Sequence, residues 1–102
     1  MIGSKVFHKQ GISFSKKVLR TYHLSVAFYR MASDVPLPGY LSDQLKRASS
    51  SIVLNIAEGA GRESFADQRR FYRIAMGSLR ECQAIITIAN LEHSLFTLSD
   101  KL

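Results

Sequence analysis

The sequence predicts an all-α protein that folds as an antiparallel up-down helical bundle. Three stretches carry apolar residues at helical spacing, a segment with two prolines and a glycine separates the first two, and no stretch alternates as a strand would. Because the chain has 102 residues, 46% of them hydrophobic, it has room for one domain with one modest core. We divide it into a basic N-terminal arm, residues 1–14, and a single helical bundle domain, residues 15–102.

The first helix is predicted over residues 15–33. Its apolar stripe is broad, since Tyr22, Leu24 and Tyr29 widen it, and a broad stripe indicates contact with more than one neighbouring helix. Residues 34–39 then break the helix, because proline and glycine do not continue it. The narrow core face consists of Val18, Thr21, Ser25, Phe28 and Ala32.

The second helix is predicted over residues 42–58. Three serines in a row, residues 49–51, are unusual inside a helix, and their small side chains would let another helix approach closely. Gly59 is expected to end the helix as a left-handed C-terminal cap. The core face consists of Leu45, Ala48, Ser49, Ile52 and Ile56.

The third helix is predicted over residues 65–91, with Ser64 and Asp67 resembling a capping box. The tail, residues 92–102, is long enough for two or three helical turns at most. At 100° per residue, one arc of the third helix forms its core face. That arc holds Phe71, Ile74, Ala75, Ser78, Cys82, Ile85, Ile86 and Ala89.

The net charge of +6 comes entirely from the first third of the chain, where residues 1–33 carry six basic groups and no acidic group. On the third helix, three arginines form a ridge opposite the core face. Such clusters favour phosphate contacts, although a solvated surface with pairs such as Asp67 with Arg70 is the alternative. The candidate nucleic-acid-binding residues are Arg69, Arg73, Arg80, Arg62, Lys16, Lys17 and Arg20.

Catalysis, cofactors and metal binding are not expected. The histidines, His8, His23 and His93, are scattered, and Cys82 lies on the predicted core face as a packing residue. A single cysteine fits a reducing compartment, and no apolar run approaches a membrane span or a secretory signal. We therefore expect a cytoplasmic protein with no membrane partner.

The polar residues near the end of the second helix predict a structural corner. Glu58 lies in the last turn, where the helix dipole disfavours an anion, so its carboxylate needs a partner. Arg62, four residues on, is the obvious one, and the free amides at the start of the third helix are another. Asn55, Glu58 and Arg62, with Gly59 and Gly61, would join the second helix to the third.

Residues 44–62 resemble the signature of the bacterial four-helix-bundle proteins that are related to the rRNA intervening-sequence proteins. A similar ring-forming protein is the accessory protein of diversity-generating retroelements, which associates with a reverse transcriptase and nucleic acid. The matching positions are Gln44, Leu45, Arg47, Ala48, Ser51, Ile52, Asn55, Ile56, Ala57, Glu58, Gly59, Gly61 and Arg62. Further matches are Tyr29, Pro36, Phe71, Ala75, Gly77, Ser78, Leu79 and Glu81.

The resemblance implies a four-helix bundle that assembles as a homopentamer with a basic surface, and it supplies no reaction or substrate. In this chain the fourth helix of the family is expected to be missing or cut to a stub. We interpret the protein as a non-enzymatic homo-oligomer that binds RNA or single-stranded DNA without sequence preference. The alternative is an adaptor that docks a protein partner on the apolar groove left by the fourth helix.

Overall fold

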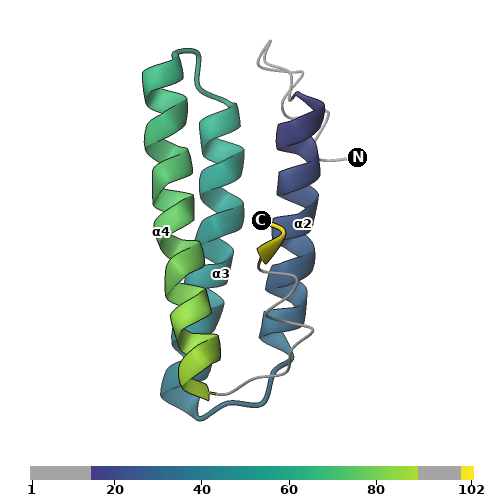
Figure 1. Ribbon diagram of the computed structural model, residues 1–102, viewed down its shortest axis with the longest axis vertical. Coiled ribbons are helices and arrows are strands. Elements are labelled where there is room, and N and C mark those ends of the chain that lie inside the picture. The colour runs from purple at the N-terminus through teal and green to yellow at the C-terminus, as the bar shows by residue number, and fades with distance from the viewer. Residues whose placement is uncertain (1–14, 90–99) are drawn as a thin grey trace.

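The computed structural model describes residues 15–89 and 100–102. In that part of the chain it contains three helices and no strand: α2 (Lys16–Ser33), α3 (Gly39–Ala60) and α4 (Phe65–Ala89). Successive helices run in opposite directions with nearly parallel axes (Figure 1). The all-α class and a helical bundle are therefore confirmed, whereas the described residues contain three helices rather than four.

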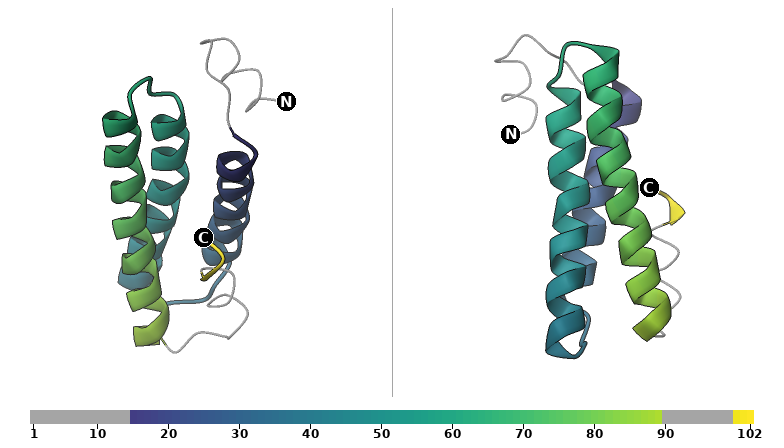
Figure 2. Two further views of the ribbon diagram at one scale, coloured as in Figure 1. Left: turned by 45° about the horizontal axis from the view of Figure 1, so that its top comes forward. Right: turned by 90° about the vertical axis from the view of Figure 1, so that its left-hand side faces the viewer.

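Helix α3 lies in the middle of the arrangement. Its backbone contacts those of α2 and α4, whereas the backbones of α2 and α4 do not contact each other. Figure 2 shows the same order from two further sides. The core therefore forms along α3, with one contribution from each neighbour.

Helix α2 matches its predicted bounds to within one residue. Ser15 caps its start, since the Ser15 hydroxyl accepts a hydrogen bond from the Val18 amide at 3.1 Å. Ser25, Phe28 and Ala32 are buried as predicted. The buried Ser25 hydroxyl donates to the Tyr22 carbonyl at 2.6 Å, so its burial leaves no polar atom unpaired.

Helix α3 is longer than predicted at both ends. It starts at Gly39 because Pro38, which has no amide hydrogen to lose, occupies the cap position, and its carbonyl accepts from the Leu41 and Ser42 amides. All five predicted core residues are buried: Leu45, Ala48, Ser49, Ile52 and Ile56.

The prediction that Gly59 is a left-handed cap is wrong. Gly59 lies inside α3 and is buried, and the helix ends at Ala60 with Gly61 as its cap at a φ of −84°. A Cβ atom on Gly59 would lie 2.7 Å from Cε1 of Tyr72 and 3.1 Å from Cβ of Phe71, both on α4. Gly59 therefore allows α3 and α4 to pack closely, and it does not terminate the helix.

Helix α4 begins at the predicted residue. The Ser64 hydroxyl accepts from the Asp67 amide at 3.1 Å, which completes one half of the expected capping box, while the Asp67 carboxylate faces Arg70. The helix is described as far as Ala89, so its predicted last two residues lie outside the described part. Most of the predicted tail helix, residues 92–99, lies outside it as well.

The core face of α4 is narrower than the predicted arc and is turned from it. Three predicted members, Phe71, Ser78 and Ala89, are half-buried. Ile74 is 43% exposed, whereas Leu79, outside the predicted arc, is buried. The predicted arc is centred on the side of the isolated helix that carries the most apolar residues, whereas the position of α3 decides which side is buried. The buried residues of α4 are Ala75, Leu79, Cys82, Ile85 and Ile86.

The serine run serves the packing of α3, as predicted. Ser49 is fully buried and donates to the Leu45 carbonyl at 2.7 Å. Ser78 of α4 donates to the Ser51 hydroxyl at 2.8 Å, a direct hydrogen bond between the two helices. Small side chains at this seam let both backbones come close while each hydroxyl keeps a partner.

The two helical glycines give a matched test of the close approach. We expect Gly59→Ala to lower the free energy of unfolding by about 1–2 kcal/mol, because overpacking against Tyr72 and Phe71 outweighs the gain in helix propensity. Gly77→Ala meets no atom within 4 Å and should raise the same free energy by about 0.5–1 kcal/mol. Urea denaturation measures both, and equal effects of the two substitutions would contradict the packing role of Gly59.

Candidate nucleic-acid interface

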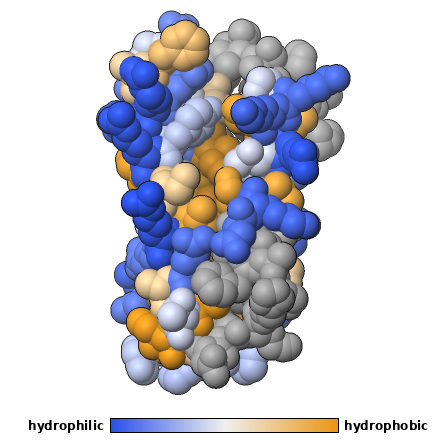
Figure 3. All heavy atoms as spheres, in the orientation of Figure 1, coloured by the Kyte–Doolittle hydropathy of each residue, from blue (hydrophilic) through white to orange (hydrophobic). Residues whose placement is uncertain are grey.

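An apolar groove runs between α2 and α4, with α3 as its floor. Its volume is about 270 Å³. In Figure 3 it appears as a hydrophobic trough between two hydrophilic borders. The residues that line it are Lys17, Val18, Thr21, Ile52, Ile56, Tyr72, Ala75, Met76, Leu79 and Leu102.

The predicted arginine ridge borders this groove on the side of α4. Arg69, Arg73 and Arg80 are exposed. Met76, which lines the groove, lies three residues after Arg73 and four before Arg80, and residues at these spacings are neighbours on a helix. The ridge therefore forms one edge of the groove, which we call the α4 rim.

The basic residues at the start of α2 border the opposite side. Lys16, Lys17 and Arg20 are exposed, and Lys17 lines the groove itself. Arg20 follows one turn after Lys17 on the same side of the helix. Lys17 and Arg20 form the α2 rim, so the groove has positive charge on both edges. Lys16 lies about 200° around the helix from Val18, which lines the groove, and therefore points away from it.

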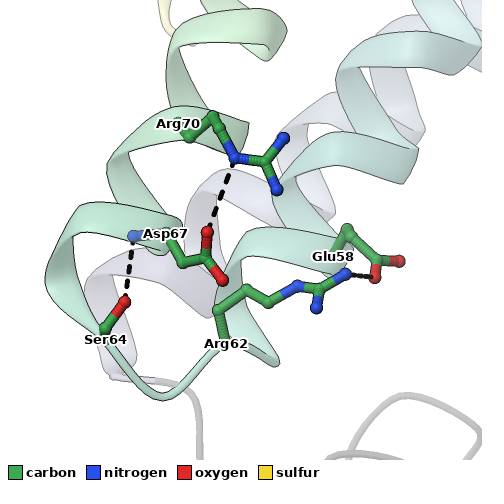
Figure 4. A network of polar contacts seen from close by, with 5 residues as sticks. All are labelled: Glu58, Arg62, Ser64, Asp67 and Arg70. Atoms are coloured by element: carbon green, nitrogen blue, oxygen red, sulfur yellow. Dashed lines mark hydrogen bonds and ion pairs between the residues drawn. The ribbon is translucent and has the colours of Figure 1, made fainter.

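The ion pairs of the described residues do not involve either rim. The two that form join Glu58 to Arg62 and Asp67 to Arg70, the second with 3.5 Å between Nε of Arg70 and Oδ1 of Asp67 (Figure 4). The three arginines of the α4 rim therefore have no carboxylate within ion-pair distance in the part of the chain that the structure describes.

The corner between α3 and α4 forms around Arg62 and Phe71. Arg62 pairs with Glu58 as predicted, and its Cζ lies 4.8 Å from the centre of the Phe71 ring. Arg70 stacks on the same ring, with its Cζ at 4.3 Å. A cation over an aromatic face is attracted to the ring electrons, so both guanidinium groups are held at the corner.

Two predicted residues belong elsewhere. Arg62 is not part of the ridge, because the Phe71 ring that it covers projects from α4 about 200° away from Arg69. Asn55 does not join Glu58 and Arg62, since its amide donates to the carbonyl and hydroxyl oxygens of Ser51 at 2.8 and 3.1 Å. Asn55 thereby belongs to the Ser51–Ser78 seam one turn before the corner.

The groove itself contains residues that sequence reasoning missed. Tyr72 and Met76 lie between the predicted core face and the ridge, and Leu102 comes from the far end of the chain. Burial raises the pKa of the Tyr72 phenol. The spacing of Met76 from Arg73 and Arg80 places it beside the ridge already in the sequence. No local pattern, however, indicates that α2 lies on the other side of the groove.

Cys82 is fully buried in the core. Burial, followed by the nearby charge of Glu81, raises the pKa of its thiol to about 12, so the thiol stays protonated at neutral pH and packs as a small apolar group. Within residues 15–89 and 100–102, no group of three or more His, Cys, Asp or Glu side chains could hold a metal ion. None of the described helices is long and apolar enough to cross a bilayer.

Comparison with known proteins identifies the family. A family model described as 23S rRNA-intervening sequence protein matches residues 15–97. The chain belongs to this family. The resemblance seen in residues 44–62 is thus confirmed, and the family match includes all three helices together with both rims. No curated protein and no solved structure matches the chain.

The Glu58–Arg62 pair should contribute little to stability, because the two side chains are 53% and 39% exposed. We expect Glu58→Gln to lower the free energy of unfolding by at most about 1 kcal/mol, as is usual for exposed ion pairs. The loss should shrink at high salt, which screens an exposed pair. Thermal melts at low and high salt measure it, and a loss above 3 kcal/mol would show that the pair is far more buried than described.

Proposed function

We propose that the protein is a cytoplasmic, non-enzymatic scaffold that binds RNA or single-stranded DNA without sequence preference. The α4 rim carries this proposal: Arg69, Arg73 and Arg80 are exposed in one line and take no part in the ion pairs of the described residues. The α2 rim adds positive charge across the groove. Membership of a family described by an rRNA intervening sequence is consistent with an RNA partner.

The spacing of the rim arginines suits phosphate contacts. Arg69 and Arg73 are one turn apart and Arg80 is two turns further on, so the row follows the helix axis for about 16 Å. A linear array of guanidinium groups matches a backbone that repeats phosphates along its length. Phosphate contacts carry no sequence information, so the binding should tolerate any sequence.

Removal of the α4 rim should weaken binding to every sequence about equally. We expect the triple substitution of Arg69, Arg73 and Arg80 by alanine to reduce the slope of log affinity against log salt by up to about three, because each arginine would neutralise one phosphate. Fluorescence anisotropy with labelled single-stranded RNA at 50 and 200 mM salt measures both effects.

A matched control removes the same charge elsewhere. Arg30, Lys46 and Arg47 are exposed and lie outside both rims, so their triple substitution by alanine should leave the affinity nearly unchanged. Equal losses in the two triple variants would show that only net charge matters. No binding by the wild type at 50 mM salt would refute the proposal.

We further propose that the chain forms a homo-oligomer, with five subunits favoured by the resemblance to ring-forming relatives. Leu54 on α3 is 65% exposed and Ile74 on α4 is 43% exposed. Each lies one turn from the hydrogen-bonded Ser51–Ser78 pair, in the same direction along the bundle, so both flank one seam. An apolar seam on the surface favours burial against another subunit.

Light scattering tests the assembly directly. We expect a mass several times that of one chain at micromolar concentration, and Leu54→Glu should shift the mass toward the monomer because it buries a charge in the seam. A single monomeric species of the wild type would contradict self-association.

The apolar groove favours a second candidate function, an adaptor that docks a partner protein. A groove lined mainly by aliphatic side chains offers few hydrogen bonds to nucleic-acid bases. The groove and the rims therefore suit different chemistry, and the groove calls for an apolar ligand.

A further inference from the structure

Helix α4 begins with an aromatic side chain that the fold does not use. Phe65 is the first residue of α4 and is 81% exposed, more than any other large hydrophobic residue in the described part of the chain. Its ring takes part in no ring contact and no cation–π contact of the described residues. Because an apolar side chain stabilises a fold by leaving water, Phe65 contributes almost nothing to the core.

Phe65 stands at the head of the arginine row of the α4 rim. Arg69 follows it by one turn, about 6 Å along the helix axis. At 100° per residue, the ring and the three arginines project within about 80° of one another. One exposed face of α4 thus carries an aromatic ring followed by three guanidinium groups that take part in no ion pair of the described residues. The row consists of Phe65, Arg69, Arg73 and Arg80.

The ring lies at one end of the bundle, apart from the groove. Phe65 is not among the residues that line the groove. Figures 1 and 2 show that the first turn of α4 follows the loop from α3 and extends beyond the start of α2. A strand that follows the arginine row therefore passes the ring where the row ends.

We propose that Phe65 is a stacking platform for an unpaired nucleobase, while the neighbouring arginines hold the phosphates of the same strand. This inference rests on the proposed nucleic-acid binding and adds a base contact to it. Every nucleobase has a flat π-face, so stacking on an aromatic ring tolerates any sequence. An exposed aromatic ring beside a basic row is the combination that single-strand-binding proteins use.

The platform selects single strands over duplexes. A duplex keeps its bases paired and stacked on each other, whereas a single strand, or an unpaired loop or end of a folded RNA, offers a base to the ring. The arginine row by itself would favour the duplex, because the duplex carries more phosphate charge per unit length. The preference for single strands therefore depends on Phe65 and the overall affinity on the arginines.

Substitutions of Phe65 test the platform. The probes are a fluorescein-labelled oligo(U) RNA and the duplex that it forms with oligo(A), in fluorescence anisotropy with the full chain at low salt. We expect Phe65→Ala to weaken binding of the single strand about tenfold, or ~1.4 kcal/mol, which lies within the range for one stacked base. Binding of the duplex should not change. Phe65→Tyr keeps an aromatic face and should bind both probes as the wild type does.

Tyr40→Ala is the matched control. Tyr40 is 69% exposed in the first turn of α3, at the opposite end of the bundle (Figure 1), so its removal should change neither affinity. Circular dichroism melts verify that the variants fold. Phe65→Ala should also keep the salt dependence of the wild type, because it removes no charge.

The outcomes separate the platform from the phosphate contacts. Unchanged binding of the single strand by Phe65→Ala, equal losses for the two probes, or an equal loss in Tyr40→Ala would overturn the platform and leave phosphate binding intact. If the wild type bound neither probe, the proposed nucleic-acid binding would fail and the platform with it.

Discussion

The close packing of α3 against α4 is the constraint on which the rest of the structure depends. At Gly59 the α3 backbone comes so near to α4 that a single Cβ atom would lie 2.7 Å from the Tyr72 ring. About two turns earlier on α3, Ser51 is joined to Ser78 of α4 through the two hydroxyl groups. Because both contacts need small side chains, they set the distance between the helices and the rotation of α4 about its own axis. That rotation decides which residues of α4 are buried, which line the groove and which form the α4 rim.

The packing of α3 against α4 positions both the corner and the groove, but the two differ in chemistry. At the corner, Phe71 lies between two guanidinium groups whose charges are already balanced by Glu58 and Asp67. On the other side of the same helix, Arg69 and Arg73 project beside the groove. Six arginines occur between residues 47 and 80. Arg62 and Arg70 pair with carboxylates at the corner, whereas the three arginines of the α4 rim take part in no ion pair of the described residues. The number of basic residues therefore says less about binding than their position on α4.

The two proposed functions would use different parts of the groove and its rims. Phosphate binding would use the rims alone, since it requires exposed positive charge and no apolar contact. Docking of a partner protein would use the mainly aliphatic lining of the groove. A partner docked in the groove would lie beside Arg69, Arg73 and Arg80, so it and a nucleic acid would compete for the same face of the molecule. Competition of this kind couples the two ligands without any change in the shape of the bundle.

The sequence by itself determined the three helices, the core face of α3 and the Glu58–Arg62 pair, because helical periodicity and spacing of four residues are local properties. It also determined the family, through the residues around Asn55 and Glu58. It misplaced Gly59 and Ile74, since both depend on how α4 packs against α3. It also joined Asn55 to the corner, whereas Asn55 donates to Ser51 one turn earlier in its own helix. Only the tertiary structure decided that the ridge of α4 faces the basic start of α2 across an apolar groove. No local pattern carries that information, because the backbones of α2 and α4 do not contact each other in the described part of the chain. Their relative position follows from the packing of each against α3 and not from the sequence of either one.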